Sequence, residues 1–240
     1  MRLDFHILPQ PDDTTCGPTC LQALYGFYGD ELPLERVIAE IPQLETGGTL
    51  GAILGRHALR RGYRARIHPL PPGVSDPTWF AQPGVKLDER LRAQLAVKGD
   101  GKLGLATRAY IDFIEAGGKI GFEDLTPSLL RRHLKRGHPI LTGLSATWLY
   151  RSAREIGAPS RYDDVHGVPA GHFVVLVGYF AEEREVLVAD PLLPNPVSDT
   201  QFYSVDIDRL VNAILLGIAT YDGNLLVLTP PEGKNEKGDA

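Results

Sequence analysis

The stretch that most constrains the fold of this chain is Gly171–Phe180, which reads G-H-F-V-V-L-V-G-Y-F. Nearly every position is apolar and glycines bound the run, a pattern typical of a β-strand that is covered on both faces. Glu185–Asp190, which reads E-V-L-V-A-D, is the expected hairpin partner. A chain with such a hairpin has to supply further elements that cover both sides of a sheet.

The chain supplies helices mainly in its first part and paired strands mainly in its last part. Helical spacing and typical start and stop residues predict helices over Leu34–Glu40, Thr49–Arg61, Leu87–Val97, Leu105–Glu115, Pro127–Lys135 (with Thr126 as cap) and Ile207–Leu216. Further strands are expected over Tyr63–Leu70, Lys119–Glu123, Pro139–Leu144, Gln201–Val205 and Asn224–Leu228. This distribution predicts an α+β domain.

Length and composition favour one domain with one hydrophobic core. The chain has 240 residues, of which 43% are hydrophobic, and it contains no visible internal repeat. We expect a single domain over residues 1–229, with insertions at 73–118 and 146–170. Residues 230–240 are polar and are expected to form a disordered tail.

Charge and hydrophobic patterning argue against two classes of partner. The formal net charge is -5 and the basic residues are scattered, so a nucleic-acid-binding surface is not expected. No apolar run approaches the roughly 20 residues of a membrane span, and Met1–Gln10 lacks the apolar region of a signal peptide. The 2 cysteines form no disulfide framework, which agrees with a reducing compartment. We therefore expect a soluble, cytoplasmic protein without a cofactor, whose oligomeric state stays open.

A cysteine stands at the predicted start of the first helix, within Leu8–Cys20. Residues typical of N-caps, Asp13–Thr15, precede Cys16, and Pro18 suits a first turn. Apolar residues then recur at helical spacing as far as Tyr28. The positive end of the helix dipole favours a thiolate over a thiol at Cys16, and a thiolate is a nucleophile near neutral pH.

Two neighbours of Cys16 have different expected roles. Gln10 can fold back and donate its side-chain amide to an oxyanion beside the main-chain N–H of Cys16. Cys20 follows on the same helix and is expected to pack into the core, because disulfide geometry between such positions is poor. Taken alone, a single cysteine is more often a small buried hydrophobic residue than a nucleophile.

The central strand and its partner supply a base and an acid. His172 begins the first strand and Asp190 ends the next, and a thiol nucleophile needs both a base and a group that orients the base. Asp190 faces His172 directly only if the hairpin is centred on Ala181, with Phe180–Glu182 as its loop; a later turn needs a bulge. Asn195 is the reserve candidate for the orienting group. Each residue also has a plain structural interpretation, His172 as a core histidine and Asp190 as the cap of a turn.

These motifs resemble, in order and spacing, those of the bacteriocin-processing leader peptidases, a family of papain-like cysteine peptidases: Gln10, then Cys16-Gly17-Pro18, then Gly171-His172-Phe173 with V-V-L-V-G-Y, then Asp190-Pro191. The resemblance implies a papain-like fold, in which an N-terminal helical part with the cysteine packs on a C-terminal antiparallel sheet with the histidine and the aspartate. It implies Cys16 as nucleophile, His172 as base, Asp190 as orienter and Gln10 as oxyanion donor. The implied reaction is hydrolysis of a peptide bond through an acyl-enzyme, with leader peptides as the substrate class.

The chain also departs from that family, and other functions stay open. Many relatives form the front domain of an ABC exporter and cut after Gly-Gly, whereas this chain has no transporter segment and carries the two extra segments, so a stand-alone relative acting on another peptide or protein is expected. The alternatives are a catalytically silent peptide-binding module on the same fold and acyl transfer to an amine or thiol. A metal site is not expected, since Asp163, Asp164, His166 and His172 match no standard ligand spacing.

The long segment 146–170 enters the strand that bears His172 and exceeds ordinary connection lengths. We expect one helical turn around Tyr150–Glu155 and loop elsewhere. Loops of this kind often bind substrates, so Trp148, Tyr150, Tyr162 and Gly171 are candidate substrate-binding residues of a lid. The alternative is an ordered surface excursion whose aromatic side chains pack on the core.

Overall fold

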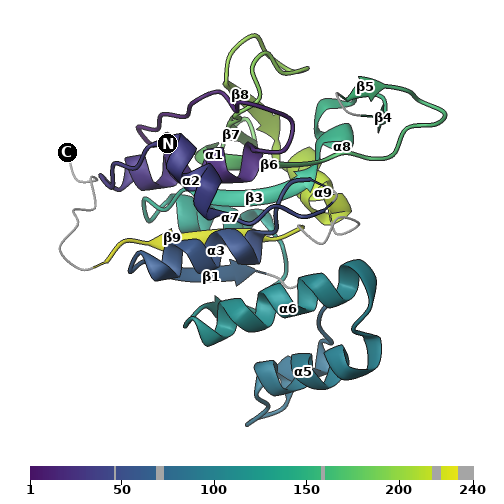
Figure 1. The fold of residues 1–240 in the computed structure, drawn as a ribbon. Helices are drawn as coiled ribbons and strands as arrows, with labels where there is room; N and C mark the ends of the chain where they lie inside the picture. The colour runs from purple at the N-terminus through teal and green to yellow at the C-terminus, as the bar shows by residue number, and fades with distance from the viewer. Residues whose placement is uncertain (46, 69–72, 158–159, 218–222, 232–240) are drawn as a thin grey trace.

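The computed structural model describes residues 1–231 except 46, 69–72, 158–159 and 218–222 (Figure 1). The centre of the protein is a seven-stranded sheet in the order β2-β1-β9-β3-β6-β7-β8. Its strands are β1 Arg64–His68, β2 Lys119–Ile120, β3 Ile140–Ser145, β6 Gly171–Phe180, β7 Glu185–Ala189, β8 Phe202–Asp206 and β9 Leu225–Thr229. The described neighbouring pairs are antiparallel except β1 and β2, which run parallel.

Helices cover both faces of this sheet. They are α1 Cys16–Phe27, α2 Leu34–Glu40, α3 Gly51–Arg60, α4 Thr78–Ala81, α5 Leu87–Lys98, α6 Gly101–Glu115, α7 Pro127–Leu134, α8 Ala146–Tyr150 and α9 Ile207–Leu216. On β6, Phe173 and Val175 lie in one core with residues of α1, α3 and α6, while Val174 and Leu176 lie in a second core with residues of α7, α8 and α9. The burial of this strand on both faces and the α+β fold class are therefore confirmed.

Several helix boundaries follow directly from local chemistry. The side chain of Thr126 accepts a hydrogen bond from the main-chain N–H of Leu129 at 3.3 Å, and Pro127 occupies the first position of α7, as predicted. Asp206 caps α9, since its carboxylate accepts hydrogen bonds from the main-chain N–H groups of Asp208 and Arg209, both at 3.0 Å. No helix within the described ranges is both long and apolar enough to span a membrane.

The β6–β7 hairpin turns later than a register centred on Ala181 requires, and it contains an irregularity of the kind expected for a later turn. Its connection is residues 181–184, in which Arg184 adopts φ 58°, and a register shift lies between Leu176 and Gly178. The predicted loop over Phe180–Glu182 is thus wrong, because Phe180 still pairs with Glu185. Ala189 pairs with Val175, so Asp190 follows the last paired residue at the level of Val174, two residues short of the point directly opposite His172. Side chains alternate along a strand, and Asp190 therefore stays on the same face as His172.

The two predicted insertions have regular structure of their own. Segment 73–118 contains α4, α5 and α6, and the predicted loop over Gly99–Gly104 is wrong because α6 already begins at Gly101. The paired α5 and α6 lie below the sheet in Figure 1. Segment 146–170 contains α8, β4 (Glu155–Ile156) and β5 (Arg161–Tyr162), and its helical turn precedes the one expected at Tyr150–Glu155. Residues 69–70 of the predicted strand and most of the predicted tail, 232–240, lie outside the described residues.

Candidate active site

Cys16 is the first residue of α1, and a hydrogen-bonded turn presents it. The side chain of Thr15, the N-cap residue, donates to the main-chain oxygen of Asp12 at 3.1 Å and accepts from the main-chain N–H of Asp12 at 3.2 Å. The carboxylate of Asp12 accepts the N–H of Thr14 at 2.8 Å. The side chain of Thr15 does not cap α1, so the first N–H groups of the helix keep no partner from that side chain; Cys16, at this helix start, is 7% exposed.

Helix α1 lies close to the start of β6, and small residues make this possible. A Cβ atom on Gly17 would stand 2.8 Å from Thr49 and 3.2 Å from Phe173, so a larger residue there would push α1 away from the strand. The thiol of Cys20 donates a hydrogen bond to the main-chain oxygen of Phe173 at 3.3 Å. Complete burial, followed by the nearby Cys16 and Asp190, holds the pKa of Cys20 well above its ordinary value. Cys20 is therefore a core residue, as predicted.

His172 lies between the cysteine and an acid. Its Nε2 is 2.8 Å from Oδ1 of Asp190, and the ring also interacts with the side chain of Cys16. The imidazole is 9% exposed and Asp190 is fully buried. Residues from the first helix, the start of β6 and the end of β7 thus meet at one point.

The carboxylate of Asp190 is held by donors on both of its oxygens. Oδ1 accepts from Nε2 of His172 at 2.8 Å and from the main-chain N–H of Leu192 at 2.9 Å. Oδ2 accepts the hydroxyl groups of Tyr150 at 2.7 Å and Tyr203 at 2.6 Å. Burial by itself would raise the pKa of Asp190, but the charge and hydrogen bond of His172 and the other donors lower it below its ordinary value. The group therefore stays ionised in the interior.

The negative charge of Asp190 determines the protonation state of His172. Burial opposes the charged ring, but the charge and hydrogen bond of Asp190, with the hydrogen bond to Cys16, together raise the pKa of His172 to about 10. The ring is thus an imidazolium at neutral pH. An imidazolium in contact with a cysteine sulfur favours the thiolate, which is the nucleophilic form.

Two tyrosines hold the carboxylate of Asp190: Tyr150, which was predicted to bind substrate, and Tyr203, which was not predicted as a site residue. Tyr150 is 8% exposed and its hydroxyl binds Asp190, so its expected position on a groove wall is wrong. Tyr203 lies on the buried face of β8, and a buried tyrosine on an inward strand position signals a hydroxyl that needs a partner. Asn195, the reserve orienter, instead donates to the main-chain oxygens of Leu192 and Thr200 at 3.3 and 3.0 Å, and it organises its own loop.

Gln10 is held beside the start of α1. Its main-chain N–H donates to the oxygen of Pro191 at 2.9 Å, which ties it to the loop that follows Asp190. Its side-chain Nε2 donates to the main-chain oxygen of Asp12 at 2.8 Å. A primary amide carries two hydrogens, so this bond orients the group while leaving the second N–H for another acceptor.

A cleft of about 830 Å³ opens onto Cys16 and His172. Three segments far apart in sequence form its walls: the loop before α3, the first half of α6, and the segment from β4 to β6. Representative lining residues are Leu44, Gly48 and Thr49; Lys102, Leu105 and Arg108; and Ile156, Ser160 and Val168. Both predicted insertions therefore contribute to the surface around the candidate site.

The candidate substrate-binding residues have separate locations. Gly171 lines the cleft. Trp148 and Tyr162 are 51% and 58% exposed and lie outside the cleft lining, so segment 146–170 reaches the cleft through residues other than its predicted aromatic ones. His166 pairs with Asp163 at 3.2 Å, and the described part of the chain contains no cluster of histidine, cysteine and acidic residues that could hold a metal ion.

Comparisons with known proteins bear on the fold and the family. Residues 108–205 match the model of the Peptidase_C39 like family, a span that contains His172 and Asp190. A structure from Bacillus anthracis described as a C39-like peptidase matches with 14% identity and a TM-score of 0.51, covering 96% of this chain and 98% of that chain. The peptidase domain of Streptococcus ComA, a bi-functional ABC transporter involved in a quorum sensing pathway, matches with 14% identity and a TM-score of 0.43, covering 93% and 97%. No curated protein matched significantly. The predicted resemblance to this group of peptidases is confirmed, and the chain has the fold of a C39-like peptidase.

Proposed function

We propose that this protein is a cysteine peptidase that hydrolyses a peptide bond with Cys16 as nucleophile, His172 as base and Asp190 as the group that orients the base. The observation that carries the proposal is the position of His172, whose ring interacts with Cys16 and hydrogen-bonds a fully buried carboxylate. The partial match to a peptidase family supports the same reaction class.

The geometry supports a two-step mechanism. The Cys16 thiolate adds to the carbonyl carbon of the substrate, and the main-chain N–H of Cys16 and the amide of Gln10 stabilise the oxyanion that forms. His172 then donates its proton to the leaving amine as the C–N bond breaks, which gives a thioester and a neutral imidazole. In the second step His172 removes a proton from water, hydroxide attacks the thioester, and the carboxylic acid product and the thiolate are released.

The substrate that the resemblance implies is a leader peptide, and a solvent-open cleft suits an extended segment of chain. The full set of chemical groups around Cys16 favours an enzyme over a silent binding module, because a binding module needs neither the sulfur nor an ion pair beside it. Hydrolysis and acyl transfer share the thioester and differ only in the acceptor that attacks it.

The proposal is tested by incubating the protein with a mixture of peptides made by digesting whole-cell protein, followed by mass spectrometry of new chain ends. We expect defined cleavage sites that disappear in Cys16→Ala and persist in Cys20→Ala, a matched cysteine replacement one helical turn away. Adding a primary amine tests the acceptor, because amide products in place of acids would indicate a transferase. Absence of any Cys16-dependent product would refute the assignment.

A further inference from the structure

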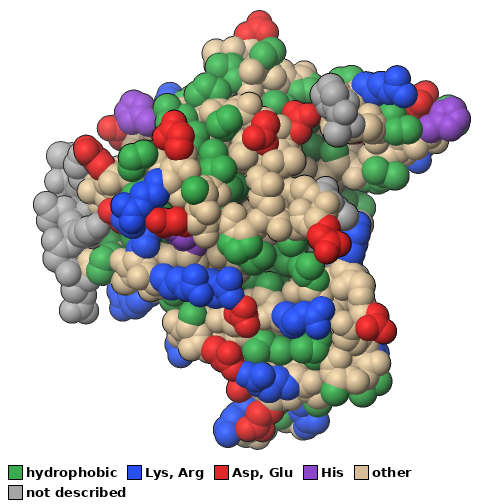
Figure 2. Space-filling model, in the orientation of Figure 1, with side chains coloured by type: hydrophobic (Ala, Val, Ile, Leu, Met, Phe, Trp, Pro, Cys, Tyr) green, Lys and Arg blue, Asp and Glu red, His purple; other side chains and the backbone are tan. Residues whose placement is uncertain are grey.

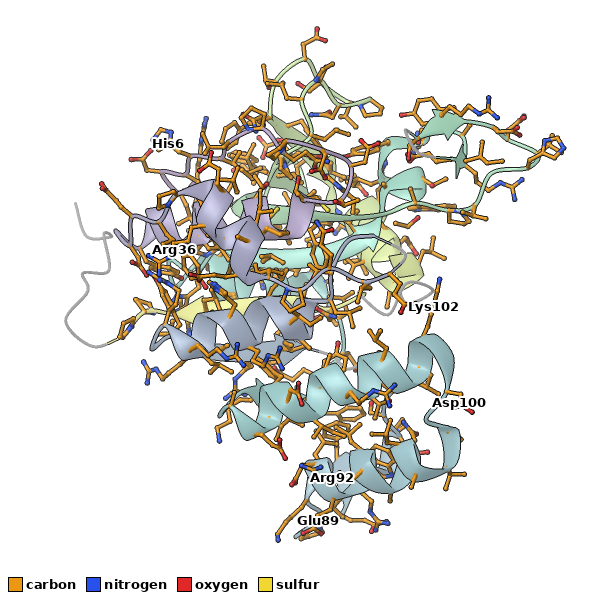
Figure 3. The ribbon with its side chains drawn as sticks, viewed as in Figure 1. His6, Arg36, Glu89, Arg92, Asp100 and Lys102 are labelled. Atoms are coloured by element: carbon orange, nitrogen blue, oxygen red, sulfur yellow. The ribbon has the colours of Figure 1, made fainter. Side chains whose placement is uncertain are left out.

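The wall that α6 contributes to the cleft carries two positive charges. Lys102, Leu105 and Arg108 all line the cleft and recur at every third position of α6, so they share one side of the helix. Figure 3 shows Lys102 extending from the first turn of α6 toward the body of the protein. With a rise of about 1.5 Å per residue, the two cationic residues stand about 9 Å apart along the helix axis.

Other charges on the same pair of helices are neutralised by neighbours. Lys86 pairs with Glu89 at 2.9 Å, Arg92 pairs with Glu115, and Asp112 pairs with Arg56 of α3. Figure 2 shows the resulting mixture of basic and acidic side chains over α5 and α6.

The two cleft-facing cations differ from these pairs. Within the described ranges, no carboxylate oxygen lies within 4.0 Å of the charged groups of Lys102 or Arg108. Both side chains are exposed, which leaves them available to a ligand in the cleft. A carboxylate is the group that both would bind, and Arg108 can bind it through two parallel hydrogen bonds.

The remaining lining of the cleft limits what else that ligand can be. Leu105, between the two cations, is 37% exposed, and Val168 of the other wall is 68% exposed, so the same surface also offers apolar contact. The acidic lining residues Asp13, Glu45 and Glu155 lie outside α6, and their negative charge would repel an acidic side chain from those parts of the cleft. This separation of charge orients an acidic peptide with its carboxylates toward α6.

We infer that Lys102 and Arg108 are specificity-determining residues, which bind acidic side chains of the peptide substrate while Leu105 contacts an apolar residue beside them. The inference rests on the proposed peptidase function and deepens it, since it assigns the substrate class as acidic peptides with apolar neighbours. These contacts form before and during the reaction alike, so they act on KM more than on kcat.

The test uses the peptide mixture described above and then pairs of synthetic peptides built on one cleaved sequence, with Glu or Gln at its acidic position. The wild-type protein is expected to cleave the Glu peptide with the higher kcat/KM. In the double variant Lys102→Glu, Arg108→Glu, we expect kcat/KM for the Glu peptide to fall about 10-fold or more, mainly through KM, with a smaller change for the Gln peptide. Added salt should reduce the preference of the wild-type protein, because it screens exposed charges.

Arg90→Glu, paired with Lys98→Glu, is the matched control, because both residues are exposed on α5 and outside the cleft lining. It makes the same change in net charge and should keep the Glu preference. If the wild-type protein cleaves peptides without any preference for acidic residues, or if the cleft variant and the control behave alike, the inference is wrong while the peptidase function stands. If no peptide is cleaved at all, the proposed function fails and the inference fails with it.

Discussion

The base of the cleft, meaning its bottom around Asp190, and the walls of the cleft differ in how their charged side chains are surrounded. At the base, Asp190 is fully buried and takes hydrogen bonds from residues of β6, α8, β8 and its own loop. On the walls, Lys102 and Arg108 are exposed side chains of a helix pair that neutralises other charges locally. In the proposed function, the interior would set the chemistry of Cys16 and the exposed walls would set which peptide is bound. Substitutions at the base should affect reaction and stability together, and substitutions on the walls should affect recognition alone.

The largest expected effect comes from Asp190→Ala. It leaves the charged ring of His172 and two tyrosine hydroxyl groups buried without their acceptor, so we expect a loss of about 3–5 kcal/mol in the free energy of unfolding. Turnover should fall about 10³- to 10⁴-fold. Denaturant unfolding and peptide kinetics measure both. Asp4→Ala is the control, because Asp4 faces His6 at 3.7 Å on the open surface, and it should leave both quantities unchanged.

The second prediction concerns the reactivity of the two cysteines. Cys16 should react with iodoacetamide at neutral pH, because its side chain interacts with the charged ring of His172, whereas buried Cys20 should stay unmodified. His172→Ala should slow the reaction of Cys16 at neutral pH. Peptide mapping of the alkylated protein distinguishes the two sites. Equal modification of both cysteines would show that Cys16 is no more reactive than the buried Cys20.

Gln10→Ala should lower turnover about 10- to 1000-fold while leaving alkylation of Cys16 unchanged. An oxyanion donor acts on the transition state, so kcat should fall more than KM rises. The measurement is steady-state kinetics beside a rate of iodoacetamide labelling. Gln22→Ala, which removes another side-chain amide that binds a main-chain oxygen, at 3.1 Å, is the matched control. Wild-type kinetics in Gln10→Ala would show that the residue only shapes the turn before α1.

The free energy of unfolding should depend on pH because of the ion pair between His172 and Asp190 at the bottom of the cleft. The pKa of His172 is raised from 6.5 to about 10 in the folded protein, so the stability that its charged form contributes is complete below pH 6.5. This contribution is lost as the pH rises toward about 10. Unfolding free energies measured over this interval should fall more steeply for the wild-type protein than for His172→Gln. Parallel curves for the two proteins would argue against a charged pair.

The smallest effect is expected from Tyr203→Phe. Asp190 keeps Tyr150, His172 and Leu192 as donors, so the loss in the free energy of unfolding should be about 1–2 kcal/mol and smaller than for Asp190→Ala. Tyr162→Phe, at an exposed tyrosine, is the control and should be neutral. Thermal or denaturant unfolding of the two variants gives the comparison. If Tyr203→Phe were as damaging as Asp190→Ala, the carboxylate would depend on that single hydroxyl.

The fold could be predicted where local sequence and burial agree. The limits of β6 and α9 are those expected, and Thr126 and Pro127 start α7 as expected, because apolar periodicity and capping chemistry act over a few neighbouring residues. The prediction of a loop at Gly99–Gly104 was wrong because it used only a local signal, the glycines, which suggest a break in a helix. Packing against α5 and the core keeps Gly101–Glu115 helical.

By itself, the sequence determined which chemical groups were available and in what order: an amide, a thiol at a helix start, an imidazole at the start of a buried strand, and a carboxylate after the next strand. Only the tertiary structure decided that Asp190 reaches His172 despite the shifted register, that Tyr150 and Tyr203 hold it, and that α6 forms a wall of the cleft. Periodicity reports which face of an element is buried. The distances between elements depend on how two cores, one on each side of the sheet, pack around β6, and no local pattern encodes that.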